Sequence, residues 1–258
     1  MDLSVVLPVY NGASFLERNV ETLALFLAGQ PGTWEIVVVD DGSTDGTDRH
    51  VGVSENVHVV RLPENRGKFA ALKAGMAVSC GRCRIFTDAD LPYDLEALPH
   101  VAALVNGRGF HVVVGDRTLS CSVYGERSTR AVSSRVFSLF VRLLVTGGLF
   151  DTQCGLKGFR GDVADALFPL LTIKGFAGDV ELLYVALKYN LEIRRIPVRL
   201  RRAEKTTVRL GTDAPAMLRD IARLRGRWDS GCYASNALAA LATQDYWPEA
   251  SASLDVHR

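Results

Sequence analysis

Two carboxylates, Asp88 and Asp90, come directly behind the short apolar segment that contains Ile85 and Phe86. In an extended chain this spacing places both side chains on one face, and in a bending chain it lets both carboxylates face one point. Such oxygen ligands suit a Mg²⁺ or Mn²⁺ ion that bridges phosphate groups. An isolated Asp-x-Asp is more often an acidic turn that caps the next helix, so the rest of the chain must decide between the two interpretations.

Five short segments have the nearly continuous apolar composition of strands that are buried on both faces. They are residues 3–9, 34–39, 57–61, 84–87 and 111–114. Helices are predicted between them at three places: at residues 13–28, from just after Lys68 to about residue 78, and between Pro92 and Pro99. Pro99 is expected to break or restart the last of these before residues 101–105. The alternation predicts a mainly parallel α/β sheet with right-handed crossovers.

Polar side chains follow four of the predicted strands at the point where each strand ends. They are Tyr10-Asn11, Asp40-Asp41, Asp88-Ala89-Asp90 and Asp116-Arg117. Because a ligand crevice lies at the carboxyl edge of an open parallel sheet, this clustering favours a binding site over a simple helix cap. Acids at Asp40 and Asp41 suit a base or a ribose, and a metal at Asp88 and Asp90 suits a diphosphate. Four cations could neutralise phosphate oxygens, namely Lys68, Arg117, Arg130 and Arg135.

The pattern changes after residue 117. Residues 127–150 have the spacing of one amphipathic helix, which would lie either in the core or at a membrane interface. Further predicted elements are a polar loop at residues 151–157, a short helical region at 159–171, a helix at 182–189, a basic strand at 193–200 and a basic amphipathic helix at 215–227. Residues 230–258 show no strong pattern and are expected to be partly disordered, or a terminal helix followed by a tail.

The composition excludes several classes of protein. With a net charge of +1, the chain lacks the strong positive potential that would attract nucleic acid. No segment has the length of a membrane-spanning helix, and no secretory signal precedes residue 3. The five cysteines then fit a reduced, cytoplasmic protein. No GxGxxG follows the first strand and no GxxxxGK[ST] occurs, which argues against dinucleotide oxidoreductases and P-loop enzymes.

Six motifs stand in order and at suitable spacings. They are Pro8-Val-Tyr-Asn11, Val39-Asp-Asp-Gly-Ser-Thr-Asp-Gly46, Asn65-Arg-Gly-Lys68, Asp88-Ala-Asp90, Asp151-Thr-Gln-Cys-Gly155 and Asp179-Val-Glu-Leu-Leu183. Together they resemble the family 2 glycosyltransferases of GT-A fold. Among these, the chain is most similar to the polyprenyl- and dolichyl-phosphate sugar synthases, and in particular to the dolichyl-phosphate β-glucosyltransferase branch.

The resemblance implies a Rossmann-like α/β fold of GT-A type, with a mainly parallel sheet flanked by helices and a C-terminal helical extension. Residues 1–228 would form one domain, with a nucleotide-sugar half at 1–116 and an acceptor half at 117–228, before a tail at 229–258. The implied nucleotide-sugar site consists of Pro8, Tyr10, Asn11, Asp40, Asp41, Lys68, Asp88 and Ala89. Asp90 would be the main ligand of Mg²⁺ or Mn²⁺, with Asp88 nearby.

The resemblance also suggests residues for the transfer step. Candidates for binding the acceptor phosphate or the leaving diphosphate are Arg117, Arg130, Arg135 and Lys205. Asp179 would be a base where the acceptor is a hydroxyl, or an orienting group where the acceptor is a lipid phosphate. The alternative interpretation of Asp179 is purely structural, as the N-cap of the following helix, and the two roles are compatible. The chain departs from the family pattern at Gly12, where many lipid-phosphate relatives have Glu, and at residues 203–205, where they have Gly-Ser-Lys.

Three functions are compatible with these observations. The favoured one is inverting, metal-dependent transfer of a hexose, with UDP-glucose as preferred donor, to a polyprenyl phosphate. The second is transfer to a soluble hydroxyl acceptor with Asp179 as base, and the third is nucleotide-sugar binding without catalysis. No nucleic-acid partner is expected. The protein is predicted to be cytoplasmic, with peripheral attachment to the cytoplasmic face of a membrane as an option. The arginines of residues 194–202 would either meet anionic lipid headgroups or protect a strand edge.

Overall fold

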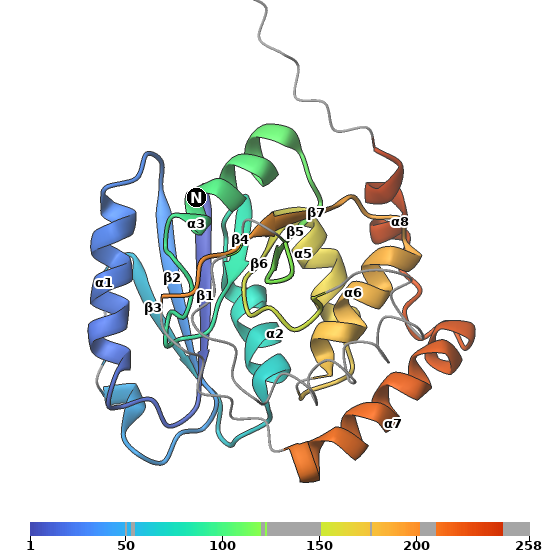
Figure 1. The fold of residues 1–258 in the computed structure, drawn as a ribbon, viewed down its shortest axis with the longest axis horizontal. Coiled ribbons are helices and arrows are strands. Elements are labelled where there is room, and N and C mark those ends of the chain that lie inside the picture. Colours follow the sequence, from blue (N-terminus) through green and yellow to red (C-terminus); the bar gives the residue numbers. More distant parts are fainter. Residues whose placement is uncertain are drawn as a thin grey trace, which may run out of the picture.

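The computed structural model describes residues 1–49, 51–52, 55–119, 122, 151–175, 177–201 and 210–244. Within them, seven strands form one sheet in the order β3-β2-β1-β4-β6-β5-β7 (Figure 1). The strands are β1 Leu3–Val9, β2 Trp34–Asp40, β3 Val57–Arg61, β4 Cys83–Phe86, β5 Val112–Asp116, β6 Lys157–Arg160 and β7 Ile193–Pro197. All neighbouring strands are parallel except for the two pairs that contain β6, so the predicted mainly parallel sheet is confirmed.

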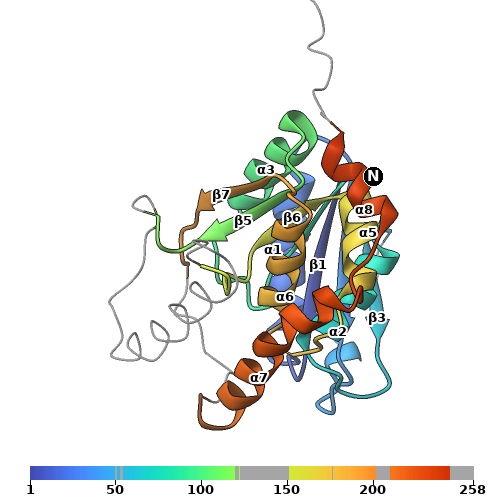
Figure 2. The ribbon, with the colours of Figure 1, turned by 90° about the vertical axis from the view of Figure 1, so that its right-hand side faces the viewer.

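Helices cover both faces of this sheet, which is why the strands β1 and β2 are mostly apolar. Alternate residues of β1 face opposite layers: Val5 and Leu7 pack with α1 Leu16–Ala28 and α3 Ala97–Ala102, and Val6 packs on the other side. The helices of that other side are α2 Lys68–Val78, α5 Gly161–Leu167, α6 Gly178–Lys188, α7 Leu210–Asp229 and α8 Asn236–Thr243. α7 lies outside α6, at the lower right of Figure 1 and towards the viewer in Figure 2.

Strand β6 was not predicted. The sequence assigned its residues partly to a polar loop and partly to the helical region 159–171, whereas helix begins at Gly161 and continues as a 3-10 turn at Phe168–Leu170. β6 is four residues long, too short to display a period of two. It enters antiparallel between β4 and β5, and a Cβ at Gly158 would overlap the side chain of Val101. The strand therefore depends on neighbours that the local sequence does not contain.

The predicted break at Pro99 is also wrong. α3 begins at Ala97, so Pro99 lies in the first turn, where its missing N–H has no intrahelical partner to lose. The helix then continues as a π-helical turn, Ala103–Gly107. At the other end of the domain, the helix predicted at residues 215–227 is longer, and the one predicted at 127–150 lies outside the described residues.

Elsewhere the boundaries differ by a few residues. The helix predicted from residue 13 begins at Leu16, after a turn in which Gly12 accepts the N–H groups of Phe15 and Leu16 through its carbonyl. The basic strand predicted at 193–200 is β7 followed by an isolated bridge between Leu200 and Tyr93.

The carboxylate of Glu181 is fully buried, and it binds the chain at the end of α7 and after it to the core. Its Oε1 accepts hydrogen bonds from Tyr233 Oη and Thr172 Oγ1, both at 2.6 Å. Its Oε2 accepts the backbone N–H groups of Thr172 at 2.9 Å and Ile173 at 2.8 Å. Arg227 Nη1 lies 3.6 Å from Oε1. Glu181 thus connects the loop before α6 to the segment that follows α7.

Part of the predicted tail packs on the domain. Tyr233 and Leu238 are 1 % and 0 % exposed and belong to the core on the α2 side of the sheet. α8 has a side-chain N-cap, because Ser235 Oγ accepts the N–H of Leu238 at 3.2 Å. The division at residue 228 stays a prediction.

Replacing Tyr233 with Phe tests the role of Glu181. The variant leaves a buried carboxylate without one of its donors, so the free energy of unfolding is expected to fall by about 1.5–3 kcal/mol. Urea denaturation measures this change. Tyr10→Phe makes the same chemical change at a side chain that is 48 % exposed, and it is expected to stay within about 0.5 kcal/mol of the wild type. Equal stability of the two variants would contradict the assignment.

Candidate active site

The turn after β1 is tied to the loop after β2. Asn11 has a positive φ of 54°, which asparagine tolerates, and its N–H donates to Ser43 Oγ at 2.8 Å. Its Oδ1 accepts the N–H of Thr44 at 2.9 Å. Gly12 N donates to Thr47 Oγ1 at 2.8 Å, and a Cβ at Gly12 would overlap the side chain of Val9. Asn11 therefore shapes the two loops, and the glycine at position 12 fits a turn without room for a side chain.

Asp40 ends β2 and is fully buried. Its Oδ1 accepts the N–H of Ser43 at 2.9 Å. Its Oδ2 is buried and makes no hydrogen bond within the described part of the chain, with Arg61 Nε at 3.7 Å. A buried acceptor of this kind is costly unless a ligand satisfies it. On the neighbouring strand β1, Pro8 is paired with Val39, the residue before Asp40, so Pro8 and Asp40 lie close together at this edge.

Asp41 holds the loop that leads to Lys68. Its Oδ1 and Oδ2 accept the backbone N–H groups of Arg66 and Gly67, each at 2.8 Å. Burial raises the pKa of the Asp41 carboxyl, although these two N–H groups oppose the shift. Gly67 has a φ of 95°, and a Cβ there would lie 2.6 Å from the carbonyl oxygen of Lys174. Asp41 thus fixes the start of α2 instead of facing an open site.

Lys68, the first residue of α2, forms an ion pair with Asp88, with 2.5 Å between Nζ and Oδ1. The Lys68 side chain is 18 % exposed and that of Asp88 is 34 % exposed. Burial by itself would raise the pKa of the Asp88 carboxyl, but the Lys68 ammonium, with further cations behind it, holds that pKa below its ordinary value. Asp88 is therefore ionised at neutral pH.

Asp90 follows in a tight turn, in which Leu91 has a φ of 48° and its N–H donates to the carbonyl of Asp88 at 3.0 Å. The carbonyl of Ala89 accepts from Asn19 Nδ2 at 3.0 Å, so Ala89 anchors this turn to α1. The next helix begins only at Ala97, and neither aspartate caps it. The cap interpretation of Asp-x-Asp is therefore wrong.

The loop at residues 151–155 joins this turn to the end of β5. Arg117 donates through Nε and Nη2 to Asp151 at 2.7 and 2.9 Å, and its backbone N–H donates to the same carboxylate at 2.9 Å. Gly155 lies directly against Asp88, where a Cβ would overlap the carboxylate. Its N–H donates to Tyr93 Oη at 3.2 Å. The bidentate pair and the glycine contact place Arg117 and Asp88 on the two sides of one loop.

Asp179 lies in the first turn of α6 and is 3 % exposed. Its Oδ1 is 2.5 Å from Nζ of Lys157, a side chain with no exposed surface. Asp179 makes no side-chain cap of α6, so that part of its predicted role is wrong. Lys157, Asp151 and Gly155 were not among the predicted site residues. The local sequence carries no signal for this pair, because β6 is too short to show the period of a strand and Asp179 lies 22 positions further along the chain.

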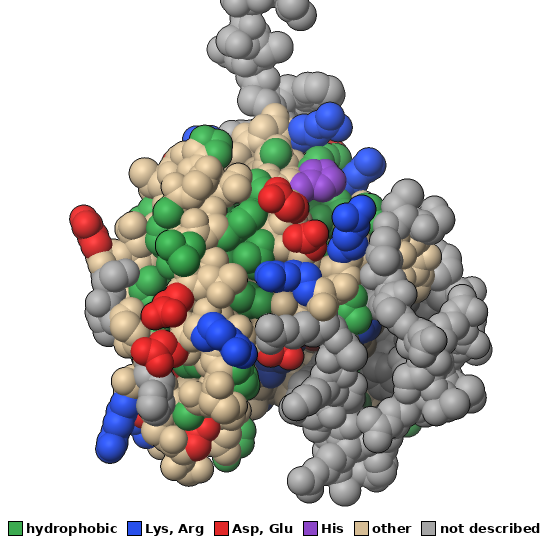
Figure 3. All heavy atoms as spheres, turned by 60° about the vertical axis from the view of Figure 1, so that its left-hand side comes forward, with side chains coloured by type: hydrophobic (Ala, Val, Ile, Leu, Met, Phe, Trp, Pro, Cys, Tyr) green, Lys and Arg blue, Asp and Glu red, His purple; other side chains and the backbone are tan. Residues whose placement is uncertain are grey.

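The structure brings one set of predicted site residues together at the carboxyl edge of the sheet. These are Pro8, Tyr10, Asn11, Asp40, Asp41, Lys68, Asp88, Ala89, Asp90, Arg117 and Asp179, of which Tyr10 is the most exposed large side chain. Arg130, Arg135 and Lys205 lie outside the described residues. On the face drawn in Figure 3, acidic and basic side chains lie beside one another over the described surface.

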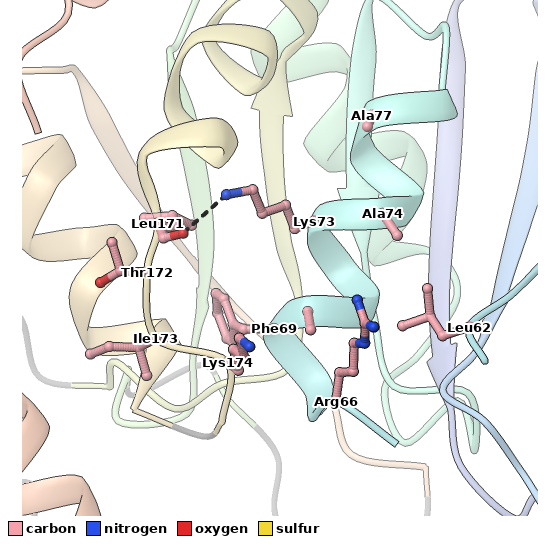
Figure 4. A pocket seen from close by; sticks show the side chains of 11 residues that line it. Leu62, Arg66, Phe69, Lys73, Ala74, Ala77, Leu171, Thr172, Ile173 and Lys174 are labelled. Atoms are coloured by element: carbon pink, nitrogen blue, oxygen red, sulfur yellow. Dashed lines mark hydrogen bonds between the residues drawn. The ribbon is translucent and has the colours of Figure 1, made fainter. Parts of the chain in front are cut away.

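A groove of about 360 Å³ lies along α2 (Figure 4), and no aspartate or glutamate is among its lining residues. It lies between Phe69, Lys73 and the loop at residues 171–174. Lys73 reaches across it and donates to the carbonyls of Pro169 at 2.8 Å and Leu171 at 3.1 Å. Lys68 points to Asp88 while the next residue, Phe69, lines the groove, so the groove and the carboxylate cluster are separate.

Two features are absent from the described residues. No three side chains of His, Cys, Asp or Glu come together there as a metal-binding set. In the same part of the chain, no helix combines the length and the hydropathy that crossing a membrane requires.

A mainly parallel sheet with acids at the carboxyl ends of its central strands agrees with the GT-A fold of nucleotide-sugar enzymes. The family model for glycosyl transferase family 2 matches residues 4–168. The chain belongs to this family, and the predictions of family, GT-A fold and glycosyltransferase activity are confirmed.

Among curated proteins, the chain is similar to dolichyl-phosphate beta-glucosyltransferases. It is 30 % identical to that of Dictyostelium discoideum, over 90 % of this chain and 76 % of the relative. It is 35 % identical to that of Drosophila melanogaster, over 77 % of this chain and 67 % of the relative.

Among solved structures, it resembles glucosyl-3-phosphoglycerate synthase from Mycobacterium tuberculosis in complex with Mn²⁺, UDP-glucose and phosphoglyceric acid. That match has a TM-score of 0.64 at 21 % identity and covers 91 % of this chain and 81 % of the other, which shows a shared fold.

The Arg117–Asp151 ion pair makes the free energy of unfolding depend on pH. Burial would raise the pKa of the Asp151 carboxyl, but its hydrogen bonds to Arg117 hold the pKa below its ordinary value of 3.8. The stabilisation is therefore complete above about pH 5 and is lost as the pH falls through the lowered pKa. Asp151→Asn is expected to lower the free energy of unfolding at pH 7 and to flatten its decline between about pH 5 and 3, measured by urea denaturation. Parallel pH curves for the two proteins would contradict this.

Gly155→Ala tests the contact with Asp88. The added methyl group forces the carboxylate away from Lys68, so affinity for UDP with Mg²⁺ is expected to fall by about tenfold, or about 1.4 kcal/mol. Isothermal titration calorimetry measures the affinity. Gly175→Ala is the matched control, since a Cβ there meets nothing within 4 Å. Unchanged affinity in Gly155→Ala would show that the contact is irrelevant to the nucleotide.

Proposed function

We propose that this chain transfers glucose from UDP-glucose to a polyprenyl phosphate, with inversion at the anomeric carbon and with Mg²⁺ or Mn²⁺ on the donor diphosphate. The observation that carries the choice of acceptor is the pairing of Asp179 with the fully buried Lys157. Asp179 is 3 % exposed and its Oδ1 is occupied by the Lys157 ammonium, so its position does not suit taking a proton from an acceptor hydroxyl. A hydroxyl acceptor needs a base, whereas a phosphate monoester, with a second pKa of about 6, is already an anion at pH 7. The names of the related dolichyl-phosphate beta-glucosyltransferases support the same acceptor class.

The donor would bind at the carboxyl ends of β1, β2 and β4. Asp40 Oδ2, a buried acceptor without a hydrogen bond among the described residues, would accept an N–H of the base. Tyr10, which is 48 % exposed, would cover the base or ribose. Asp41 and Asn11 would act by holding the loops in place, because their oxygens already accept backbone N–H groups.

The residues fit a divalent ion whose coordination shell is completed by oxygen atoms of the substrate. Lys68 occupies Oδ1 of Asp88, so Asp90 would be the main ligand and Asp88 would hold the lysine. Mg²⁺ commonly uses one or two carboxylates together with water and substrate phosphates, which agrees with a site that lacks a third acid among the described side chains. When bound, the ion would stabilise the charge that develops on the departing diphosphate.

The acceptor would approach from the side of Arg117, whose guanidinium is oriented by Asp151. Since a polyprenyl phosphate resides in a membrane, the protein would work at a membrane surface, on its cytoplasmic face. Arg194, Arg199 and Arg201 are exposed and would face anionic headgroups. Arg195 is directed inward to Asp116, at 2.7 Å, and would not take part.

Transfer of labelled glucose from UDP-glucose to undecaprenyl or dolichyl phosphate in detergent tests the proposal. EDTA is expected to abolish the reaction and added Mg²⁺ or Mn²⁺ to restore it. Asp90→Ala is expected to lower kcat/KM by about 100-fold, or about 2.7 kcal/mol. Glu96→Ala removes an exposed carboxylate six positions along the chain and should leave the rate unchanged. Activity that survives EDTA, or transfer to soluble hydroxyl acceptors alone, would overturn the proposal.

A further inference from the structure

Lys157 is a lysine with no exposed surface, in the interior strand β6. Removing an ammonium group from water costs several kcal/mol unless partners compensate it. Its Nζ donates to the carbonyl oxygen of Cys154 at 2.7 Å and to Asp179 Oδ1 at 2.5 Å. It also lies 5.4 Å from the centre of the Phe86 ring, within range of a cation–π contact. The ammonium is therefore held by three groups from three different segments.

The register of β6 places this lysine between the two sides of the site. Lys157 is paired with Phe86 of β4, the strand that leads to Asp88 and Asp90. On its other side it is paired with Val114 of β5, the strand that leads to Arg117. Because β6 runs antiparallel to both, its first residue lies at their carboxyl ends.

The contacts of Lys157 reach both sides through one loop. By binding the Cys154 carbonyl, the ammonium fixes the loop whose Asp151 orients Arg117 and whose Gly155 lies against Asp88. By binding Asp179, it fixes the start of α6 relative to the same loop. The positive charge also favours the ionised forms of Asp88 and Asp151.

We propose that Lys157 is a positioning residue for the transfer step: its ammonium holds the 151–155 loop and Asp179 so that the donor-side Asp88 and the acceptor-side Arg117 keep their relative placement. The inference rests on the proposed function. Lys157 has no exposed surface and would contact neither substrate, so its loss is expected to act on kcat and on the acceptor more than on the affinity for UDP, whose implied contacts lie at the ends of β1, β2 and β4 and on Lys68 of α2.

The variants separate positioning from folding. Lys157→Met with Asp179→Asn removes both charges and leaves no unpaired buried ion. Lys157→Gln keeps a donor for the Cys154 carbonyl, and it serves if the double variant does not fold. Asp179→Asn alone keeps the lysine. Lys73→Met is the matched control, because Lys73 also ties a loop through two backbone carbonyls but lies in the groove away from the site.

Steady-state kinetics and UDP titration are performed on each full-length variant, with thermal unfolding to verify the fold. For the double variant, kcat is expected to fall by about 100-fold, while the Kd for UDP with Mn²⁺ rises by less than the roughly tenfold expected for direct displacement of Asp88 in Gly155→Ala. Lys157→Gln should show the same split to a smaller extent, and Lys157→Arg should recover part of kcat. Asp179→Asn should lose less than about tenfold, and Lys73→Met should retain wild-type kinetics.

Three results overturn the inference while the proposed function stands. They are a kcat within threefold of wild type in the folded lysine variants, a loss of UDP affinity as large as the loss of kcat, and a loss in Asp179→Asn as large as in the double variant. The proposed function fails by a different result, the absence of transfer to polyprenyl phosphate by the wild-type protein, and the inference falls with it.

Discussion

The buried ammonium of Lys157 is the interaction on which the site depends. It lies where an antiparallel strand enters an otherwise parallel sheet, so it contacts segments on the proposed donor side and on the proposed acceptor side. A charge without water must be compensated, and the compensation fixes the positions of its partners. Asp179 and the Cys154 carbonyl are held for this reason, and with them the loop that contacts Asp88 and orients Arg117.

The site is built from opposite charges in pairs. Lys68 pairs with Asp88, Arg117 with Asp151 and Lys157 with Asp179, and each pair joins a strand end or loop to another segment. In the partly buried interior these pairs are stronger than they would be in water, so the groups are held in place before a ligand arrives. Preorganised charges of this kind are what a reaction that expels a diphosphate requires. The family membership and the geometry thus agree on the class of chemistry.

Glycines and short hydrogen bonds determine the shape of the loops. Gly67 and Gly155 let backbone come close to the Lys174 carbonyl and to the Asp88 carboxylate, where a side chain would not fit. The side-chain oxygens of Asp41 and Asn11 accept hydrogen bonds from backbone N–H groups of neighbouring loops. Two residues that the sequence indicated as nucleotide ligands therefore hold the loops of the site in place. Glu181 does the same for the loop before α6 and for the chain that follows α7.

The sequence by itself determined the mainly parallel sheet, because buried strands such as β1 and β2 are apolar on both faces and helices with regular spacing separate them. It also placed Asp40, Asp88, Asp90 and Arg117 at the carboxyl ends of strands. Because these ends lie at one edge of a parallel sheet, the sequence indicated that the four residues are neighbours. Tertiary structure alone decided the rest. β6 exists because β4 and β5 offer it partners, and Lys157 finds Asp179 across 22 positions of the chain. A local pattern carries the period of an element, but the choice of a charge's partner is made by the fold, at distances that sequence spacing does not encode.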